Sequence, residues 1–228
     1  MSNLIMQKEI KDDVANTLVI KDDLFLFEEF KSIEQIYSAG IKEVKTKLDI
    51  LDDEFHIKYA HNPIHHMEWR LKTPKSIYNK MQKRNIDMNE ASLMENIQDI
   101  AGIRVICNYV KDIYRIAELL VKQDDVTLIK RKDYIKHPKD NGYRSLHLVI
   151  AVPVFLSENT RLVPVEIQIR TIAMDFWASL EHQLRYKADT DVPADIRDRL
   201  YECAQSITQL DQEMESIHNE LKEHKDDK

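Results

Sequence analysis

The sequence is poor in glycine, with only Gly40, Gly102 and Gly142 in a chain of 228 residues. The usual share is about 7%. Phosphate-binding loops of the Walker type and the dinucleotide-binding fingerprint both need closely spaced glycines. The sequence therefore excludes both kinds of loop, and any nucleotide phosphates must be bound by side chains.

Cysteines and long hydrophobic runs are also scarce. Cys107 and Cys203 lie far apart without metal-ligand spacing, which indicates two free thiols in a reducing compartment. No apolar run approaches the ~20 residues of a membrane span. Residues 1–11 lack the basic-then-apolar pattern of a signal peptide. We therefore expect a cytoplasmic protein without a membrane segment.

The chain is acidic overall, but its positive charge is concentrated. Asp and Glu number 40 against 33 Lys and Arg, a formal net charge of −7, so the protein as a whole should bind nucleic acid poorly. Two segments, 69–84 and 130–147, hold most of the clustered basic residues. They indicate a small polyanion such as a nucleotide polyphosphate, although a solvated basic helix face has the same composition.

Hydrophobic periodicity predicts an α+β fold with helices at both ends. Apolar residues at helical spacing predict a long helix over 24–51, which Gly40 should bend or end. Residues 52–69 have a mixed pattern, and Pro63 marks an irregular connection within them. Further helices are predicted over 74–85, 89–97, 112–122 and 171–187, and strands over 103–107, 126–130, 145–152 and 162–170. A mixed sheet flanked by helices follows from this order.

We divide the chain into an N-terminal arm and helical extension (1–60), a main domain (61–190) and a C-terminal helix (191–228). The last segment carries apolar residues in 4-3-4-3 spacing: Ile196, Leu200, Cys203, Ile207, Leu210, Met214, Ile217 and Leu221. Such a heptad pattern predicts either an oligomer contact or a helix docked on its own domain. Both interpretations stay open.

Three basic or hydroxyl side chains follow one another at four-residue steps. Thr73-Pro74 is typical of a helix start, and Lys72, Ser76 and Lys80 then fall on one helix face. Two ammonium groups and a hydroxyl on one face are suited to phosphates.

A strand over 165–170 would place a carboxylate, an amide and a guanidinium in line. Period two puts Glu166, Gln168 and Arg170 on one face. That face is either the floor of a site or a solvated outer face. Asp99 precedes another predicted strand and could supply a second carboxylate. One or two carboxylates with substrate phosphates are the usual ligands of Mg²⁺ in nucleotide transfer.

The loop 141–147 has the composition of a binding loop. Gly142 allows a turn that leaves Tyr143 at the tip, where a tyrosine stacks on a base or packs as in an ordinary hairpin. His147 could donate to a phosphate. In contrast, His56, His61, His65 and His66 lack zinc-site spacing and are more typical of a surface cluster.

Five segments resemble the synthetase domain of the RelA/SpoT family: 70–77, 99–105, 132–135, 138–147 and 165–171. They occur in the family's order over residues 70–187. The short chain and the absence of a His-Asp dyad make it similar to a small alarmone synthetase of the RelP or RelQ type, RelP being the closer match.

The resemblance implies a mixed five-stranded sheet flanked by helices, distantly similar to nucleotidyltransferases. It also implies a GTP diphosphokinase that moves the β,γ-pyrophosphate of ATP to the 3′-hydroxyl of GDP or GTP. The products are AMP and ppGpp or pppGpp, the alarmones of the stringent response. Mg²⁺ is the implied cofactor. A homotetramer built on terminal helices is implied as well, and alarmone or single-stranded RNA is a possible effector.

The resemblance further implies roles for individual residues. The ATP side would comprise Arg70, Lys72, Ser76, Lys80 and Arg104, with Arg84 as a further candidate. The guanosine side would comprise Tyr143, which would stack on guanine, and Lys139, Asn141, His147 and Gln168. Asp99 would bind Mg²⁺, and Glu166 would bind Mg²⁺, take the proton from the 3′-hydroxyl, or do both.

Two departures and two other functions remain open. The segment Lys130-Arg131-Lys132-Asp133 keeps the charge of the family's Arg-x-Lys-Asp motif but leaves the choice between GDP and GTP open. Asp175 stands where the family often has His or Asn, and a carboxylate there is expected to repel phosphate or recruit metal. The alternatives are a non-catalytic nucleotide- or RNA-binding regulator and a nucleotidyltransferase that releases pyrophosphate.

Overall fold

The computed structural model describes residues 23–87, 89–187 and 193–226. A five-stranded sheet lies at its centre, with the strand order β1-β2-β5-β4-β3. β2 and β5 are parallel, and the other neighbours are antiparallel. The strands are β1 (Ile64–Leu71), β2 (Ala101–Cys107), β3 (Thr127–Asp133), β4 (Leu146–Phe155) and β5 (Thr160–Thr171). The predicted mixed five-stranded α+β fold is confirmed.

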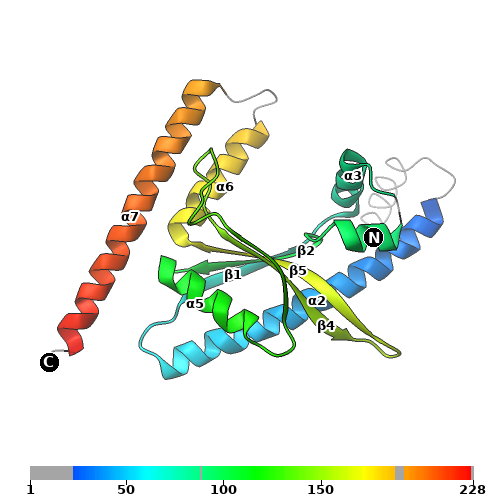
Figure 1. The fold of residues 1–228 in the computed structure, drawn as a ribbon, viewed down its shortest axis with the longest axis horizontal. Helices are drawn as coiled ribbons and strands as arrows, with labels where there is room; N and C mark the ends of the chain where they lie inside the picture. Colours follow the sequence, from blue (N-terminus) through cyan, green and yellow to red (C-terminus); the bar gives the residue numbers. More distant parts are fainter. Residues whose placement is uncertain (1–22, 88, 188–192, 227–228) are drawn as a thin grey trace, which may run out of the picture.

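Six helices surround the sheet in the described part of the chain (Figure 1). They are α2 (Asp23–Lys58), α3 (Pro74–Arg84), α4 (Glu90–Asn96), α5 (Val110–Val121), α6 (Ile172–Lys187) and α7 (Ala194–Asp226). α3 begins as its sequence predicts, because Thr73 accepts a hydrogen bond from the backbone N–H of Ser76 and Pro74 occupies the first turn. Within the described residues, helices α2 and α7 precede and follow the sheet domain, as expected.

Sequence reasoning missed the helical turns and the strand within segment 52–69, in which only residues 59–63 around Pro63 are irregular. Its first part continues α2 to Lys58, and residues from Ile64 onward form β1. β1 is an edge strand that pairs with β2 alone, and most of its side chains are exposed. From residue 66 to residue 71 polar and apolar residues alternate, and Met67 and Leu71 pack against the core. The period-two signal of a strand was therefore present in the sequence and was missed.

The predicted bend or end at Gly40 was also wrong, because α2 runs through this residue without interruption. A Cβ at position 40 would lie 2.7 Å from Cγ1 of Val163 on β5. The glycine therefore allows the helix backbone to approach the sheet closely. Tyr37, Val44 and Leu48 on either side of this crossing are buried in the main core.

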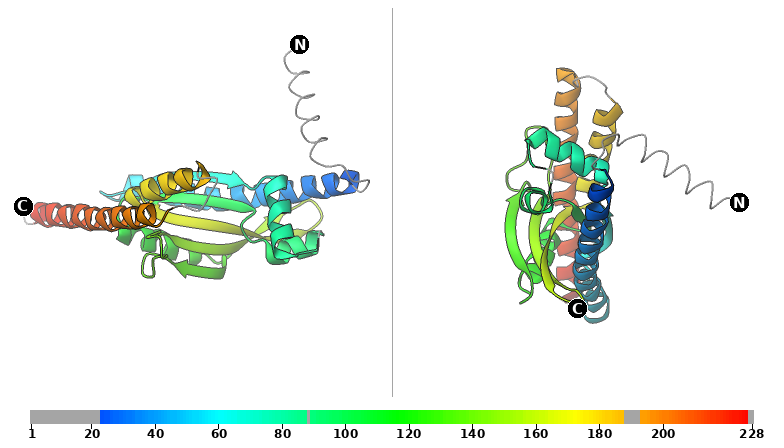
Figure 2. Two further views of the ribbon diagram at one scale, coloured as in Figure 1. Left: turned by 90° about the horizontal axis from the view of Figure 1, so that it is seen from above. Right: turned by 90° about the vertical axis from the view of Figure 1, so that its right-hand side faces the viewer.

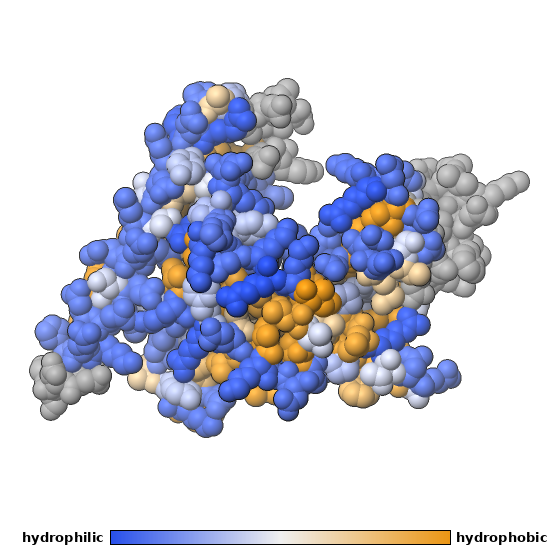
Figure 3. Space-filling model, in the orientation of Figure 1, coloured by the Kyte–Doolittle hydropathy of each residue, from blue (hydrophilic) through white to orange (hydrophobic). Residues whose placement is uncertain are grey.

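The two faces of β5 have different environments. Val163, Val165, Ile167 and Ile169 are fully buried in the core, and α2 and α5 both contact β5. Figure 2 shows α2 lying along one face of the sheet. The intervening residues from Glu166 to Arg170 point to the opposite face, as the period-two pattern predicted. Figure 3 shows apolar residues gathered over the middle of the sheet, near β4 and β5, while α7 presents a mostly hydrophilic surface on this side.

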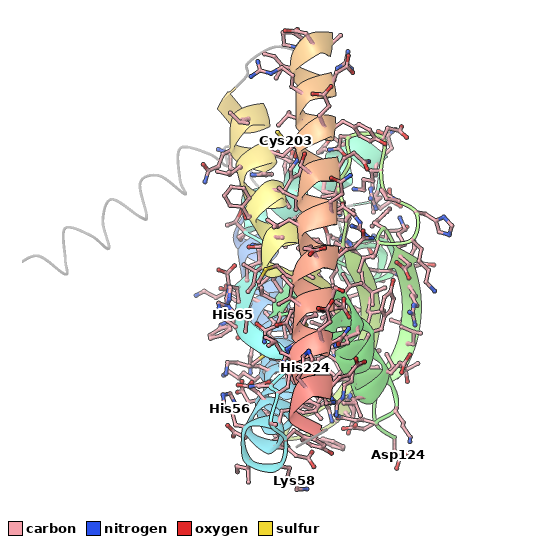
Figure 4. The ribbon with its side chains drawn as sticks, turned by 90° about the vertical axis from the view of Figure 1, so that its left-hand side faces the viewer. His56, Lys58, His65, Asp124, Cys203 and His224 are labelled. Carbon is pink, nitrogen blue, oxygen red and sulfur yellow. The ribbon has the colours of Figure 1, made fainter. Side chains whose placement is uncertain are left out.

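α7 packs along α6 and continues past the sheet (Figures 1 and 4). The indole Nε1 of Trp177 donates to the carbonyl of Leu200 at 3.0 Å. The hydroxyl of Thr171 donates to Oδ2 of Asp211 at 2.5 Å, and Ala204 is buried beside Trp177. The helix thus docks on its own domain through a face centred on Ala204 and Asp211.

Most of the heptad pattern does not lie on that docked face. Leu200 and Ile207 are partly buried against it, but five apolar members are between 40 and 59% exposed: Ile196, Leu210, Met214, Ile217 and Leu221. The helix therefore has a docked face and an apolar stripe that the described residues do not cover. Among the described residues, no helix is both long and apolar enough to cross a membrane.

Candidate active site

The open face of the sheet carries two rows of side chains that cross all five strands. Register places Glu68, Arg104, Gln168, His147 and Lys132 in one row. The adjacent row holds Arg70, Gly102, Glu166, Val149 and Lys130. Strand pairing thus brings together charged residues that are up to about a hundred positions apart in the sequence.

A carboxylate held by two lysines lies where β1 leads into α3. Lys72 and Lys80 donate to the same oxygen of Asp99, Oδ2, at 2.7 and 2.6 Å. Burial would raise the pKa of the Asp99 carboxyl, but the hydrogen bonds and charges of the two lysines outweigh it and hold the pKa below its usual value. Asp99 is therefore ionised at neutral pH, and both ammonium groups are fixed at its side.

The other predicted residues of α3 lie at its exposed surface. The Ser76 hydroxyl is 2.9 Å from the Thr73 hydroxyl at the start of the helix. Arg84 donates to the carbonyl of Asn96 at 3.2 Å and so joins the ends of α3 and α4. Arg70 is exposed on β1, and its side chain lies over the position of Gly102 on β2.

Glu166 occupies the middle of β5 with one partner for each carboxylate oxygen. His147 Nδ1 lies 3.4 Å from Oε1, and Gln168 donates to Oε2 at 3.1 Å. Burial would raise the pKa of Glu166, but the interactions with His147 and the Gln168 amide lower it below its usual value. The negative charge of Asp99 raises the pKa of the Glu166 carboxyl and so partly offsets this lowering. The two carboxylates therefore lie within electrostatic reach of each other.

An aromatic group adjoins Glu166. The Tyr143 hydroxyl and His147 Nε2 are 2.7 Å apart, and the ring of Tyr134 meets both of these rings edge-on. Lys139 Nζ lies 4.6 Å from the centroid of Tyr143 and 4.8 Å from that of Tyr134. Because Lys139 is exposed, it can leave the Tyr143 ring when another planar or cationic group takes its place.

The loop that carries Tyr143 is fixed from beneath. Asn141 donates to Glu181 of α6 at 3.1 Å and accepts from the backbone N–H of Tyr143. Arg144 donates to the Thr208 hydroxyl of α7 at 2.8 Å. Asn141 therefore holds the loop on α6 in this structure rather than pointing to the group around Glu166.

The carboxylate pair fits a magnesium ion. Oδ1 of Asp99 is buried and has no hydrogen-bond partner among the described residues, although buried carboxylate oxygens are normally paired. Oxygen ligands from one or two carboxylates are what Mg²⁺ uses when phosphates complete its shell. Within the described residues, no group of three or more His, Cys, Asp or Glu side chains could hold a metal unaided.

Known proteins match this chain over most of its length. The family model described as "Region found in RelA / SpoT proteins" matches residues 69–191. GTP pyrophosphokinase YwaC of Bacillus subtilis is 43% identical over 201 residues, which cover 88% of this chain and 96% of that protein. The chain belongs to the RelA/SpoT family.

Solved structures of the family have the same fold. Small alarmone synthetase 1 of Bacillus subtilis, bound to its product pppGpp, matches with a TM-score of 0.76 at 37% identity, covering 83% of this chain and 98% of that one. The same protein bound to AMPCPP matches with a TM-score of 0.72 at 34% identity, covering 86% and 99%. The resemblance inferred from the sequence segments is confirmed.

The RelA/SpoT segments converge into two neighbouring groups. Segments 70–77 and 99–105 bring Lys72 to Asp99, and α3, which begins in the first of them, adds Lys80. Segments 138–147 and 165–171 bring Tyr143 and His147 to Glu166. Arg104 lies between the groups, with Nη1 donating to Glu68 at 3.1 Å.

The four histidines that the sequence left open point to separate partners. His61 Nε2 lies 2.8 Å from Oδ2 of the buried Asp112, and the rings of His65 and His66 contact each other. His56 is bonded to its own helix and to Asn62. Figure 4 shows His56 and His65 well apart, and it shows Cys203 distant from both on α7.

Sequence reasoning missed the roles of Arg170 and Asp175. Arg170 was placed on the face of Glu166 but was not assigned to the site, although it donates to Gln168 and Tyr143. Asp175 was expected to repel phosphate or recruit metal. In the structure it is bonded to Arg170 and lies 3.6 Å from Arg104, so its charge is offset by two guanidinium groups. The alternation along β5 was the available signal for Arg170.

Proposed function

We propose that this chain is a GTP pyrophosphokinase that transfers the β,γ-pyrophosphate of ATP to the 3′-hydroxyl of GDP or GTP, giving AMP and ppGpp or pppGpp. The observation that carries this proposal is the pair of carboxylates, Asp99 and Glu166, between a lysine group and an aromatic group. A donor nucleotide and an acceptor nucleotide need separate binding groups on the two sides of the carboxylates. The named relatives, a GTP pyrophosphokinase and an alarmone synthetase with bound pppGpp, support the same reaction.

The ATP side is assigned to the basic residues of β1, β2 and α3. Lys72 and Lys80 meet the phosphates as point charges, with the Ser76 hydroxyl one turn along, and Arg70 and Arg104 enclose the adenine from neighbouring strands. Transfer of a polyanionic group depends mainly on positioning and charge neutralisation. Fixed ammonium groups supply both.

Magnesium is assigned to Asp99 and Glu166. Bound there, it would neutralise part of the charge on the transferred phosphates. Asp99 contributes the buried oxygen that lacks a protein partner, and Lys72 and Lys80 keep its carboxylate ionised. The two lysines thus hold the carboxylate in place and face the phosphates at once.

Glu166 is also assigned the proton of the attacking 3′-hydroxyl. Its lowered pKa keeps the carboxylate ionised at neutral pH, so it can accept that proton, and Gln168 orients Oε2. Tyr143 stacks on guanine in place of the exposed Lys139, while Lys139, His147 and Gln168 contact the guanosine nucleotide. Asn141 acts through the position of the loop.

Replacement of Glu166 by Gln tests the reaction. The amide keeps the shape but accepts no proton, so turnover should fall by about 10²–10⁴-fold while GDP still binds. Purified protein is incubated with ATP, GDP and Mg²⁺, and the nucleotides are resolved by anion exchange. Glu158→Gln, at the exposed β4–β5 turn, is the matched control. Near wild-type turnover in Glu166→Gln would refute its role as the base.

The products distinguish the other functions. Equal amounts of AMP and a more highly charged guanosine nucleotide identify pyrophosphate transfer. Release of pyrophosphate instead would identify a nucleotidyltransferase. No AMP with GDP, GTP or GMP would favour a non-catalytic regulator, and RNA binding with a steep salt dependence would then be measured. Both carboxylates are present, so the regulator is not favoured.

We also propose that the protein forms a homo-oligomer, a tetramer by analogy with its family, through α6 and α7. α6 carries a stripe of exposed apolar residues at four-residue steps: Ile172, Phe176, Leu180 and Leu184. With the uncovered stripe of α7, these residues form the kind of surface that monomers rarely expose. Catalysis is assigned to the main domain, 61–190, whose last helix α6 also takes part in assembly together with the C-terminal helix, 191–228. The nucleotide substrates favour a cytoplasmic location, and alarmone or single-stranded RNA remains a candidate effector.

A further inference from the structure

Arg170 belongs to a closed ring of side-chain contacts on the open face of the sheet. Its Nη2 donates to the Tyr143 hydroxyl at 2.6 Å and to Oε1 of Gln168 at 3.0 Å. The Gln168 amide donates to Glu166, Glu166 lies beside His147, and His147 Nε2 lies 2.7 Å from the Tyr143 hydroxyl. Four members of this ring have proposed roles at the substrate, and Arg170 has none.

Burial shows that Arg170 is a fixed part of this ring. It is 5% exposed, and its Nε lies 3.4 Å from the buried Ser145 hydroxyl. Arg170 and Lys139 both approach the Tyr143 ring, at 5.2 and 4.6 Å from the centroid. Lys139 is exposed and can be displaced by a base, whereas Arg170 is buried and is held in place. Arg170 therefore sets the orientation of the ring on which a base stacks.

Asp175, in the first turn of α6, holds Arg170 in this position. Its Oδ1 accepts from Nη1 of Arg170 at 2.9 Å and lies 3.6 Å from Nε of Arg104. Two guanidinium groups this close repel each other unless an anion separates them. Among the described residues, Nε of Arg104 is buried without a hydrogen bond. Asp175 is the carboxylate that faces this nitrogen, while Glu68 accepts from Nη1 of the same guanidinium at 3.1 Å. Asp175 thus joins the guanosine side of the site to the ATP side.

We propose that Arg170 and Asp175 are a pair of positioning residues for the transfer. Arg170 orients Tyr143 and Gln168 toward the guanosine nucleotide, and Asp175 holds Arg170 in place beside Arg104. Neither residue touches the reacting atoms. This inference rests on the proposed function. It assigns to the Asp175 carboxylate the role of holding Arg170 in place, whereas the sequence suggested that it repels phosphate or recruits metal.

Substitutions that keep size but change the contacts test this pair. Arg170→Lys keeps the charge but cannot reach Tyr143, Gln168 and Asp175 together, because an ammonium is a point donor rather than a planar fork. It should raise the KM for GDP about tenfold, the cost of one charge-assisted hydrogen bond, and leave the KM for ATP within about twofold. Asp175→Asn should raise the KM for GDP by a smaller factor. The double variant should match Arg170→Lys, because residues acting through one contact are not additive.

Matched controls and folding measurements accompany these variants. Arg161→Lys lies on the same strand at the β4–β5 hairpin end, and Asp198→Asn lies on the exposed surface of α7. Both should leave the two KM values unchanged. Thermal unfolding shows whether each variant folds. Should Arg170→Lys fail to fold, the more exposed Asp175→Asn decides the test, and a KM for GDP equal to that of the wild type overturns the proposal.

The inference and the reaction fail in different ways. If the wild type forms AMP but both KM values rise in parallel, or the two single effects multiply in the double variant, the positioning pair is wrong and the reaction stands. If the wild type forms no AMP, the reaction is wrong. Calorimetric titration with GDP alone then decides: tenfold weaker binding by Arg170→Lys supports the pair, and unchanged binding refutes it.

Discussion

Gly142 is a position where a single methyl group should disturb both the fold and the site. It has a φ of +85°, a region that L-residues adopt at a cost, and its N–H donates to the carbonyl of Lys139 at 2.8 Å. A Cβ at this position would lie 2.5 Å from the Cβ of Ala204 on α7. Neither methyl can rotate away, because each is fixed to its backbone. Gly142→Ala must therefore displace the loop or α7.

The expected magnitude follows from two separate costs. The left-handed conformation costs a non-glycine residue ~1–2 kcal/mol. Overpacking of a close contact costs a further ~1–3 kcal/mol. Gly142→Ala should therefore lower the free energy of unfolding by about 2–5 kcal/mol. Because Tyr143 is the next residue, the KM for GDP should rise more than the KM for ATP.

Ala204→Gly separates the two costs. It removes the methyl that the new Cβ meets but leaves φ unchanged, and alone it costs ~1 kcal/mol as a glycine within a helix. Urea unfolding of the wild type, both single variants and the double variant gives the coupling energy, which should favour the double variant by about 1–3 kcal/mol. Strictly additive effects, or a Gly142→Ala variant as stable as the wild type, would refute the role of this contact.

Three further outcomes are expected. Gly40→Ala should lower the free energy of unfolding in urea, because overpacking against Val163 costs ~1–3 kcal/mol and helix propensity returns only ~1 kcal/mol. Adding Val163→Ala to the Gly40→Ala variant should reverse this loss. Folding lowers the pKa of Asp99, so the ionised carboxylate stabilises the folded protein fully above about pH 4, and this stabilisation is lost as the pH falls through the folded pKa. In urea titrations between pH 5 and 3, the free energy of unfolding of Asp99→Asn should therefore decline less steeply than that of the wild type. Leu210→Glu should lower the mass found by light scattering, and an unchanged mass would argue against α7 as an assembly surface.

Some features of this protein follow from short stretches of sequence. The start of α3 at Thr73-Pro74 depends on a cap and a proline that lie side by side, so it could be predicted locally. The alternation along β5 separated its core face from the face of Glu166 and Gln168 for the same reason. The family could be inferred because its segments keep their order along the chain.

Other features depend on neighbours that are distant in the sequence. β1 pairs with β2 at the edge of the sheet, although the alternation over residues 66–71 was a local signal for this strand. Gly40 looked like a helix breaker, and only the passage of α2 over Val163 shows why a glycine is needed there.

The site shows the same division between sequence and tertiary structure. The sequence alone determined which residue types occur: two carboxylates, clustered lysines and a loop with a tyrosine. The tertiary structure decided which of them meet, because the register of five strands and the docking of α6 and α7 set every distance among them. Asp175 is the clearest case. Its charge could be read from the sequence, but its effect depends on Arg170 and Arg104, which the fold places within hydrogen-bond and ion-pair distance of one of its oxygens.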